Sequence, residues 1–350
     1  MKIGIVGLPG AGKTTIFNAL TGNAADTSSY SGGSKEPNLA VVKVPDSRLD
    51  KLSEMYKPKK TTYAQVEYVD VAGTIPVKDH EQKGSLDKFL TLLRPVDAIL
   101  HVVRGFELHG TLPEPQRDVD DFEAELVLAD LIIAEKRLER LQKEVKKGKK
   151  GNPRELELLE KTVKLLNEGR PLRPYPDLAN APELKGYAFL SAKPCIIVLN
   201  IADEANYGEL EIKPPEGVPV LEIKGRLEME LAELPEKEAG EFRKDLGVSE
   251  PATFQLIRTS HKLLGLISFF TVGEDEVRAW NIKKGTTAQK AAGVIHTDIE
   301  RGFIRAEVVA YDDLIEAGSY SNAQKSGKVR LEGKDYIVQD GDIINFRFNV

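Results

Sequence analysis

The eight residues from Gly7 to Thr14 constrain this chain more than any other stretch of its sequence. They follow the pattern G-x-x-x-x-G-K-[ST], in which the glycines let backbone N–H groups converge on an anion. A short apolar run, Ile3 to Val6, precedes the pattern, and a helical pattern from Thr15 to Leu20 follows it. The positive end of the helix dipole then points at the same anion, which distinguishes a phosphate-binding loop from an ordinary glycine-rich turn. The stretch therefore predicts a P-loop nucleotide-binding domain.

Individual residues of this loop have separate predicted roles. Lys13 is expected to reach the β- and γ-phosphates and to act in catalysis, and Thr14 is expected to coordinate Mg²⁺. The predicted nucleotide contacts of the loop are consecutive in the sequence: Pro9, Gly10, Ala11, Gly12, Lys13, Thr14 and Thr15.

Two further segments contribute to the predicted metal and catalytic site. Asp70 lies in the β-branched run Gln65 to Val71, and Gly73 follows it three residues later. In P-loop enzymes such an aspartate holds Mg²⁺, and the glycine presents a backbone N–H to the γ-phosphate. Ser34, in the Ser- and Gly-rich loop 22–37, is the best candidate for a second hydroxyl ligand of Mg²⁺. The alternative is that Ser34 is an ordinary solvated loop residue.

The residue after Gly73 bears on the rate of hydrolysis. Many small GTPases have a glutamine there to orient the attacking water, whereas this chain has Thr74. Hydrolysis is therefore predicted to be slow without a partner. His109 lies in the Gly- and Pro-containing loop 105–115 and is predicted to bring an imidazole to the nucleotide. His101, in contrast, lies in an apolar strand pattern and is predicted to be packed in the core.

The predicted base site follows two later strand patterns. The apolar run Cys195 to Leu199 leads into Asn200, Ile201 and Asp203, where G proteins carry N-K-x-D, and Lys224 with Gly225 falls where a second base-side loop is expected. Asp203 offers guanine a carboxylate acceptor, but Ile201 replaces the usual lysine and the amide of Asn200 suits adenine too. ATP is predicted over GTP, and GTP remains the alternative.

From residue 120 onward the apolar spacing becomes helical. Two stretches, beginning near Phe122 and near Leu156, predict an antiparallel helical hairpin. Its tip, residues 143–154, is rich in lysine, so it is either a solvated end or a contact for an RNA phosphate backbone. The last segment, from about residue 268, shows short strand patterns around one helix at 287–296, which suggests a β-grasp module that binds a partner. The predicted strands are 278–282, 304–310, 328–330, 336–338 and 343–348.

The composition limits the possible partners of the chain and the compartment in which it works. The 350 residues carry a net charge of -6, so an RNA contact must come from a local patch. The single cysteine, Cys195, excludes an internal disulfide and fits a reducing compartment. It lies in an apolar run and is predicted to be a small buried apolar side chain, not a reactive thiol. Neither a leader nor an apolar run of membrane-spanning length is apparent, so a soluble cytoplasmic protein without a membrane partner is expected.

Several motifs together resemble one family, the YchF translation-associated P-loop ATPases of the Obg group. The motifs include G-L-P-x-x-G-K from Gly7, E-P-N at 36–38, V-P-D-x-R-L-D at 44–50, L-A-D at 128–130, V-R-A-W at 277–280, A-A-G-x-I-H-T-D at 291–298, G-F-I-R-A at 302–306 and G-K-D-Y-I-V at 333–338. The last four resemble the TGS domain of that family. The resemblance implies slow ATP hydrolysis and association with the ribosome, through its large subunit and rRNA.

The predicted fold class is α/β: a doubly wound P-loop domain with an inserted helical coiled-coil hairpin and a C-terminal β-grasp (TGS) domain. The predicted boundaries are 1–119 and 185–267 for the P-loop domain, 120–184 for the hairpin and 268–350 for the tail. The function predicted first is a ribosome-associated, Mg²⁺-dependent ATPase that acts as a translation switch. A GTPase of the same role and a nucleotide-sensing ribosome- or RNA-binding protein with incidental hydrolysis are the alternatives.

Overall fold

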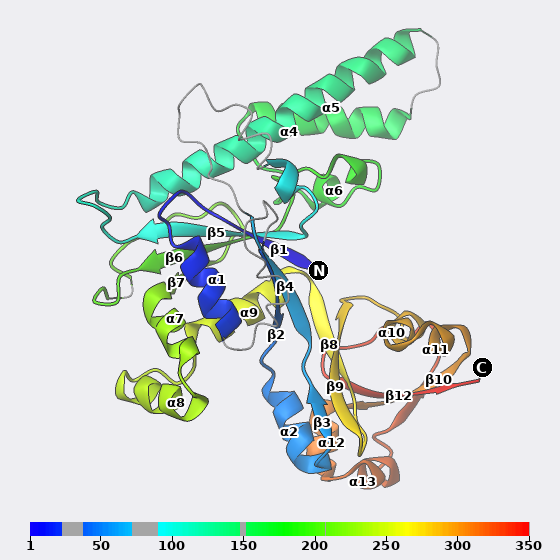
Figure 1. The fold of residues 1–350 in the computed structure, drawn as a ribbon. Coiled ribbons are helices and arrows are strands. Elements are labelled where there is room, and N and C mark those ends of the chain that lie inside the picture. Colours follow the sequence, from blue (N-terminus) through cyan, green and yellow to red (C-terminus); the bar gives the residue numbers. More distant parts are fainter. Residues whose placement is uncertain (23–37, 72–89, 148–151, 207, 350) are drawn as a thin grey trace. The chain divides into compact units, whose positions relative to one another are not determined.

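The computed structural model describes residues 1–22, 38–71, 90–147, 152–206 and 208–349 (Figure 1). Contacts divide the chain into two compact units. The first is formed by Met1–Val41 and Glu67–Leu256, and the second by Val42–Val66 and Ile257–Val350. The predicted P-loop domain corresponds to much of the first unit, and the predicted tail corresponds to much of the second.

The sheet of the first unit is largely parallel. Its order is β2-β4-β1-β5-β6-β7, and each neighbouring pair from β4 to β7 is parallel. The strands are β1 (Lys2–Val6), β2 (Asn38–Lys43), β4 (Gln65–Asp70), β5 (Ala98–Gly105), β6 (Cys195–Ile201) and β7 (Val220–Ile223). All seven residues of β6 are buried, because a parallel sheet with helices on both faces leaves neither face to solvent.

Helices cover this sheet on both sides. Figure 1 shows α4 on one side and α1 with α7 on the other. The helices that lie in or enter this unit are α1 (Lys13–Thr21), α4 (Pro115–Lys146), α5 (Pro153–Asn167), α6 (Pro176–Ala179), α7 (Gly225–Glu233), α8 (Glu236–Asp245) and α9 (Ala252–Leu263). The doubly wound fold predicted from the alternating strands and helices is confirmed. None of the helices in the described ranges is both long and apolar enough to cross a membrane.

The predicted helical hairpin consists of α4 and α5. Apolar side chains at helical spacing on both helices, among them Leu141 and Leu159, form a shared core. Asn152 begins α5 as its N-cap, and its side chain accepts hydrogen bonds from the two N–H groups that follow Pro153. The buried Asp130 of α4 accepts the backbone N–H groups of Leu190 and Ser191 at 2.9 and 2.7 Å, which fixes the hairpin to the segment that precedes β6.

The start of the hairpin differs from the predicted boundary at residue 120. α4 begins at Pro115, with Glu114 as its N-cap. Proline suits the first turn of a helix, because its ring fixes φ near the helical value and it lacks only an N–H that would have no partner there. The helical apolar spacing that defined the prediction starts later, at Phe122.

The second unit is a mixed sheet with one face packed against α10. Its strand order is β11-β10-β12-β8-β9-β3. The elements are α2 (Ser47–Tyr56), β3 (Lys60–Thr62), β8 (Leu266–Thr271), β9 (Glu276–Lys283), α10 (Ala288–Ile295), α11 (Thr297–Arg301), β10 (Phe303–Ala310), α12 (Tyr311–Ala317), α13 (Tyr320–Lys325), β11 (Arg330–Glu332) and β12 (Asp342–Phe348). Three alanines of α10 lie in a core with Phe269 and Phe346, as the β-grasp prediction requires.

Two details of the tail were predicted incorrectly. The run Tyr336 to Val338 is not a strand, because within the described ranges it makes a single isolated bridge, between Ile337 and Thr287. The strand predicted at 328–330 lies two residues later, as β11. The short helices α11, α12 and α13 were not predicted, since five to seven residues carry too little periodicity to be recognised.

Residues 42–66 group with the C-terminal segment and not with the P-loop segment to which the predicted boundaries assigned them. β3 pairs in parallel with β9, with Lys60 opposite Glu276. Arg48, in the V-P-D-x-R-L-D motif, bonds to Asp46 at 2.8 Å and to Asp340 at 2.9 Å. The pairing of β3 with β9 and the bond from Arg48 to Asp340 each join residues more than 200 positions apart, so no local pattern indicates them.

Candidate functional site

The parallel strands of the first unit bring the predicted site segments to one edge. The P-loop follows β1, Asp70 ends β4, and the loop containing His109 follows β5. Asn200 lies near the end of β6, and Lys224 follows β7. The register places Ile5 beside Asp70 and Asn200 beside Ile223, so the ends of β1 and β4 are level with each other, as are the ends of β6 and β7. Ligands of open α/β sheets bind at this carboxyl edge.

The P-loop presents unused backbone donors at the start of α1. Gly12 is the N-cap of α1 with φ 89°, a left-handed conformation that favours glycine, and no side chain in the described part of the chain caps this helix. The N–H of Ala11 bonds to the carbonyl of Leu8 at 3.2 Å, which closes the turn before the helix. The first N–H groups of α1 have no partner within the helix, so they are available to an anion.

Lys13 and Asp70 form the charged centre of the site. The Lys13 ammonium donates to the carbonyl oxygens of Gly7 at 3.1 Å and Leu8 at 3.2 Å, which holds it over the loop. Burial lowers the pKa of Lys13, and the charge of Asp70 acts in the opposite direction. Burial raises the pKa of Asp70, and the charge of Lys13 opposes that rise. An ammonium and a carboxylate thus lie at the edge where a phosphate and a cation would be held.

Asn200 joins the P-loop to the loop after β7. Its side-chain nitrogen donates to the carbonyl of Ala11 at 3.0 Å, and its side-chain oxygen accepts from the N–H of Gly225 at 3.1 Å. The residue is only 4% exposed. A Cβ added to Gly12 would overlap the Asn200 amide, and one added to Gly225 would come within 2.6 Å of its oxygen. Glycine at both positions therefore permits the close approach that this bridge needs.

The other residues predicted at the base site are arranged around the start of α7. Asp203 accepts the N–H of Leu227 at 3.3 Å, so its carboxylate contacts the positive end of the helix. Lys224 donates to the main-chain oxygen of Asp203 at 2.8 Å. The side chain of Ile201 is packed in the core of the sheet, which leaves only its main chain for a nucleotide contact.

The loop that contains His109 lies beside the P-loop. A Cβ added to Gly10 would come within 2.5 Å of the Leu108 side chain, so the two loops are in contact there. Leu108 and Thr111 exchange two backbone hydrogen bonds, which close a turn that contains His109. The φ of His109 is 49°, and its side chain is exposed. Arg104 donates to the carbonyls of Phe106, Thr111 and Leu112 at 2.7 to 3.0 Å.

Sequence reasoning missed Arg104 and Leu108. An arginine near the end of an apolar strand is a recognisable signal, because a buried strand rarely contains a charge without a partner. The exposed loop around Leu108 gave no such signal. Thr14 is exposed next to Lys13. The predicted roles of Ser34 and Gly73 fall on residues outside the described ranges.

Two buried residues have the roles predicted for them. Burial, with the nearby charges of Arg173 and Lys13, lowers the pKa of His101 to about 3, and its ring packs on Phe122 with 4.3 Å between ring centroids. It is therefore a neutral core residue. Burial raises the pKa of the Cys195 thiol to about 12, so this cysteine is an inert apolar side chain.

Comparison with known proteins identifies the family. The family model for the C-terminal domain of YchF GTPases, described as a protein of unknown function, matches residues 266–349. A second model, described as a 50S ribosome-binding GTPase, matches residues 2–146. The Ribosome-binding ATPase YchF of Pasteurella multocida is 44% identical, over 100% of this chain and 99% of its own length. The chain belongs to the YchF family.

Other YchF proteins show the same full-length similarity. The Bacillus subtilis protein of that name is 42% identical over 100% of both chains. A solved structure, named as the Schizosaccharomyces pombe YchF GTPase, superposes with a TM-score of 0.86 at 32% identity, covering 99% of this chain and 97% of that one. A GTP-binding protein from Pyrococcus horikoshii shares the fold, with a TM-score of 0.61 at 22% identity. The family and the fold class predicted from the motifs are thus confirmed.

Proposed function

We propose that this chain is a ribosome-binding ATPase that hydrolyses ATP slowly, with Mg²⁺, in its P-loop site. The observation that carries the proposal is the placement of Lys13, Asp70 and the uncapped start of α1 at one edge of the parallel sheet. Bacterial YchF relatives bear the name Ribosome-binding ATPase, which supports both parts of the proposal.

The phosphate end of the site fits a nucleotide with a hard cation. The Thr14 hydroxyl and the Asp70 carboxylate are oxygen ligands of the kind that Mg²⁺ prefers, and the cation shields charge on the phosphates. Burial of Asp70 disfavours its ionised form, so a cation at this carboxylate would relieve that cost. Lys13 would exchange its bonds to the Gly7 and Leu8 carbonyls for phosphate oxygens, and the N–H groups from Gly12 to Thr15 would bind the same phosphates. Pro9, Gly10 and Ala11 would shape the loop around them.

At the base end, we expect ATP to bind more tightly than GTP. Selection of guanine needs a carboxylate that accepts from N1–H and N2 together, and the Asp203 carboxylate is already engaged by Leu227. The Asn200 amide is used in its bridge between the loops, so its role here is to position Ala11 and Gly225 around the base. Titration of fluorescent ATP and GTP with Mg²⁺ checks the preference. GTP binding more than about tenfold tighter, or roughly 1.4 kcal/mol, contradicts it.

His109 is the proposed group that approaches the reacting phosphate. Its loop contacts the P-loop through Leu108, and Arg104 fixes the turn on which it lies. We expect His109→Gln to lower ATP turnover by about tenfold while leaving ATP affinity unchanged, since a positioned acid–base group acts on the chemical step. Leu112→Gln, in the same exposed loop, serves as the control. Unchanged turnover in His109→Gln would contradict a catalytic role of His109, but it would not contradict the assignment of the nucleotide-binding site.

For the ribosome contact, we propose the basic tip of the helical hairpin, directed at rRNA of the large subunit. α4 ends at Lys146, and the lysines at 149 and 150 lie outside the described residues. Changing Lys146, Lys147, Lys149 and Lys150 to glutamate is expected to weaken ribosome co-sedimentation and to flatten its salt dependence, because clustered cations gain affinity by releasing counterions.

A matched control has the same change in net charge elsewhere. The exposed lysines at 237, 244, 284 and 325, all changed to glutamate, are suitable for this purpose. The control variant is expected to co-sediment as the unaltered chain does. Equal losses in both variants would mean that net charge, and not the hairpin tip, determines binding.

A further inference from the structure

One strand of the second unit has part of an edge without a neighbouring strand. β12 pairs with β10 along its whole length, from Asp342 to Phe348. On its other edge β12 pairs in parallel with β8, and the pairing is limited to Ile343 opposite Phe270. β8 ends at Thr271, after which the chain turns into β9. Among the described strands, none is paired with residues 344–348 on this side.

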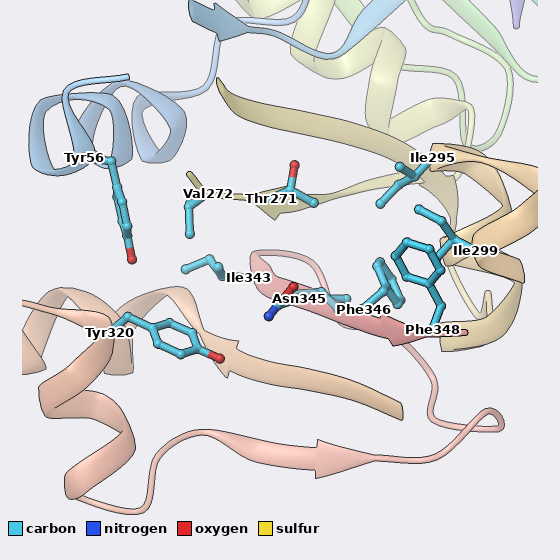
Figure 2. Close-up of a pocket in the computed structure, with 11 residues that line it drawn as sticks. Tyr56, Thr271, Val272, Ile295, Ile299, Tyr320, Ile343, Asn345, Phe346 and Phe348 are labelled. Carbon is cyan, nitrogen blue, oxygen red and sulfur yellow. The ribbon is translucent and has the colours of Figure 1, made fainter. Parts of the chain in front are cut away.

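A pocket of about 470 Å³ lies at this open edge (Figure 2). Successive side chains of a strand point to opposite faces of the sheet, so β12 contributes to two different walls. Phe346 and Phe348 lie with Ile295 and Ile299 at the apolar end of the pocket. Asn345 comes from the opposite face of β12.

The other end of the pocket has hydroxyl groups. Tyr56 and Tyr320 line it, on α2 and α13 respectively. The Tyr320 hydroxyl donates to Glu307 at 3.2 Å, and the amide of Asn345 donates to the same carboxylate oxygen at 3.1 Å. The Tyr56 hydroxyl is buried and has no hydrogen-bond partner among the described residues. A buried hydroxyl without a partner is costly, so this end of the pocket favours a polar group from an occupant.

We propose that the pocket binds an extended peptide segment that adds a strand to the open edge of β12. An unpaired strand edge offers a row of N–H and C=O groups, which an added strand satisfies through main-chain hydrogen bonds. Residues 344–348 of β12 are unpaired on this edge, so the bound segment is expected to be about five residues long. The walls set the pattern: apolar side chains pack toward Ile299 and Phe348, and alternate polar side chains face the end of the pocket that Tyr56 and Tyr320 line. The strand β11, at the outer edge of the same sheet, is a less suitable site for an added strand. It has three residues, which are too few to fix the register of a bound peptide.

The test uses the full chain and a defined peptide mixture. The mixture contains acetylated, amidated pentapeptides with Val, Ile, Leu or Phe at positions 1, 3 and 5 and Ser, Thr or Asn at positions 2 and 4. A matched mixture has every backbone nitrogen methylated, which removes the N–H donors and keeps the side chains. We expect the first mixture to slow hydrogen exchange in residues 344–348 at least tenfold and the methylated mixture to leave it unchanged. Equal slowing by both mixtures, or slowing by neither, overturns strand addition.

Two protein variants locate the binding. Phe348→Lys places a charge at the apolar wall, and because Phe348 is 45% exposed the fold is expected to tolerate it. Leu331→Lys makes the same change at a residue of β11 that is 61% exposed, and it is the control. We expect Phe348→Lys to weaken peptide binding at least tenfold and Leu331→Lys to change it less than about twofold, with thermal unfolding measured for both. Equal effects in the two variants would contradict the assignment of the pocket.

Discussion

Replacing Lys13 with alanine is expected to weaken binding of ATP by at least about a hundredfold and to leave the fold intact. Among the described residues, the Lys13 ammonium donates hydrogen bonds to the carbonyls of Gly7 and Leu8. Burial disfavours its charged form, so removing the ammonium offsets part of the loss of these two bonds. With nucleotide bound, the same ammonium is proposed to reach the phosphates, where a charge-assisted bond is about twice as strong as a neutral one. Isothermal titration with ATP and Mg²⁺ measures the loss.

Arg226→Ala is the matched control for Lys13→Ala. It removes one positive charge close to Lys224, and its side chain is 76% exposed and paired with Glu230. We expect it to change ATP affinity by less than about threefold, since an exposed ion pair contributes little. A Lys13→Ala variant that binds ATP as the unaltered chain does would contradict the assignment of the phosphate site.

The second large effect is expected at Asn200. Asn200→Ala removes the bridge between Ala11 and Gly225 and leaves a buried carbonyl and a buried N–H without their partner. Each unsatisfied buried group costs about 1–3 kcal/mol, so the two together are expected to lower the free energy of unfolding by about 2–6 kcal/mol. ATP affinity is expected to fall more than tenfold, because the P-loop and the start of α7 lose their common support.

Two further variants make the Asn200 test specific. Asn200→Asp keeps an acceptor for Gly225 but cannot donate to Ala11, so it is expected to lose stability and affinity as well. Asn206→Ala, at an exposed asparagine that bonds to Glu209 in the same loop region, is expected to change the free energy of unfolding by less than about 0.5 kcal/mol. Denaturant unfolding and ATP titration of all three variants provide the comparison. Normal ATP affinity in Asn200→Ala would show that the bridge does not support the site.

The placement of several residues of the proposed nucleotide site could be predicted, because their signals are local. The P-loop pattern, the apolar strand before it and the helix after it are contiguous from Ile3 to Leu20. Asp70 and Asn200 each lie at the end of an apolar strand, and parallel strands bring such ends to one edge. The long hairpin was also visible, because α4 and α5 repeat apolar residues at helical spacing over many turns.

What could not be predicted depends on contacts between distant segments. The pairing of β3 with β9 joins Lys60 to Glu276, and nothing near Lys60 indicates its partner. The hydrogen bonds of the Asn200 amide to Ala11 and Gly225 were not predicted, because both partners are on loops distant in sequence. Alternation near Tyr336 resembled a strand, but a strand also needs a neighbour with free backbone groups, and a sequence pattern does not reveal one.

The release of phosphate from ATP is the most direct test of the account. Turnover is measured for the purified chain with Mg²⁺, with EDTA, and for the Lys13→Ala variant, each with and without ribosomes. The account predicts slow phosphate release with Mg²⁺ that is lost in EDTA and in Lys13→Ala. Release that persists in Lys13→Ala, or no release from ATP by the unaltered chain in the presence of Mg²⁺ and ribosomes, would contradict it.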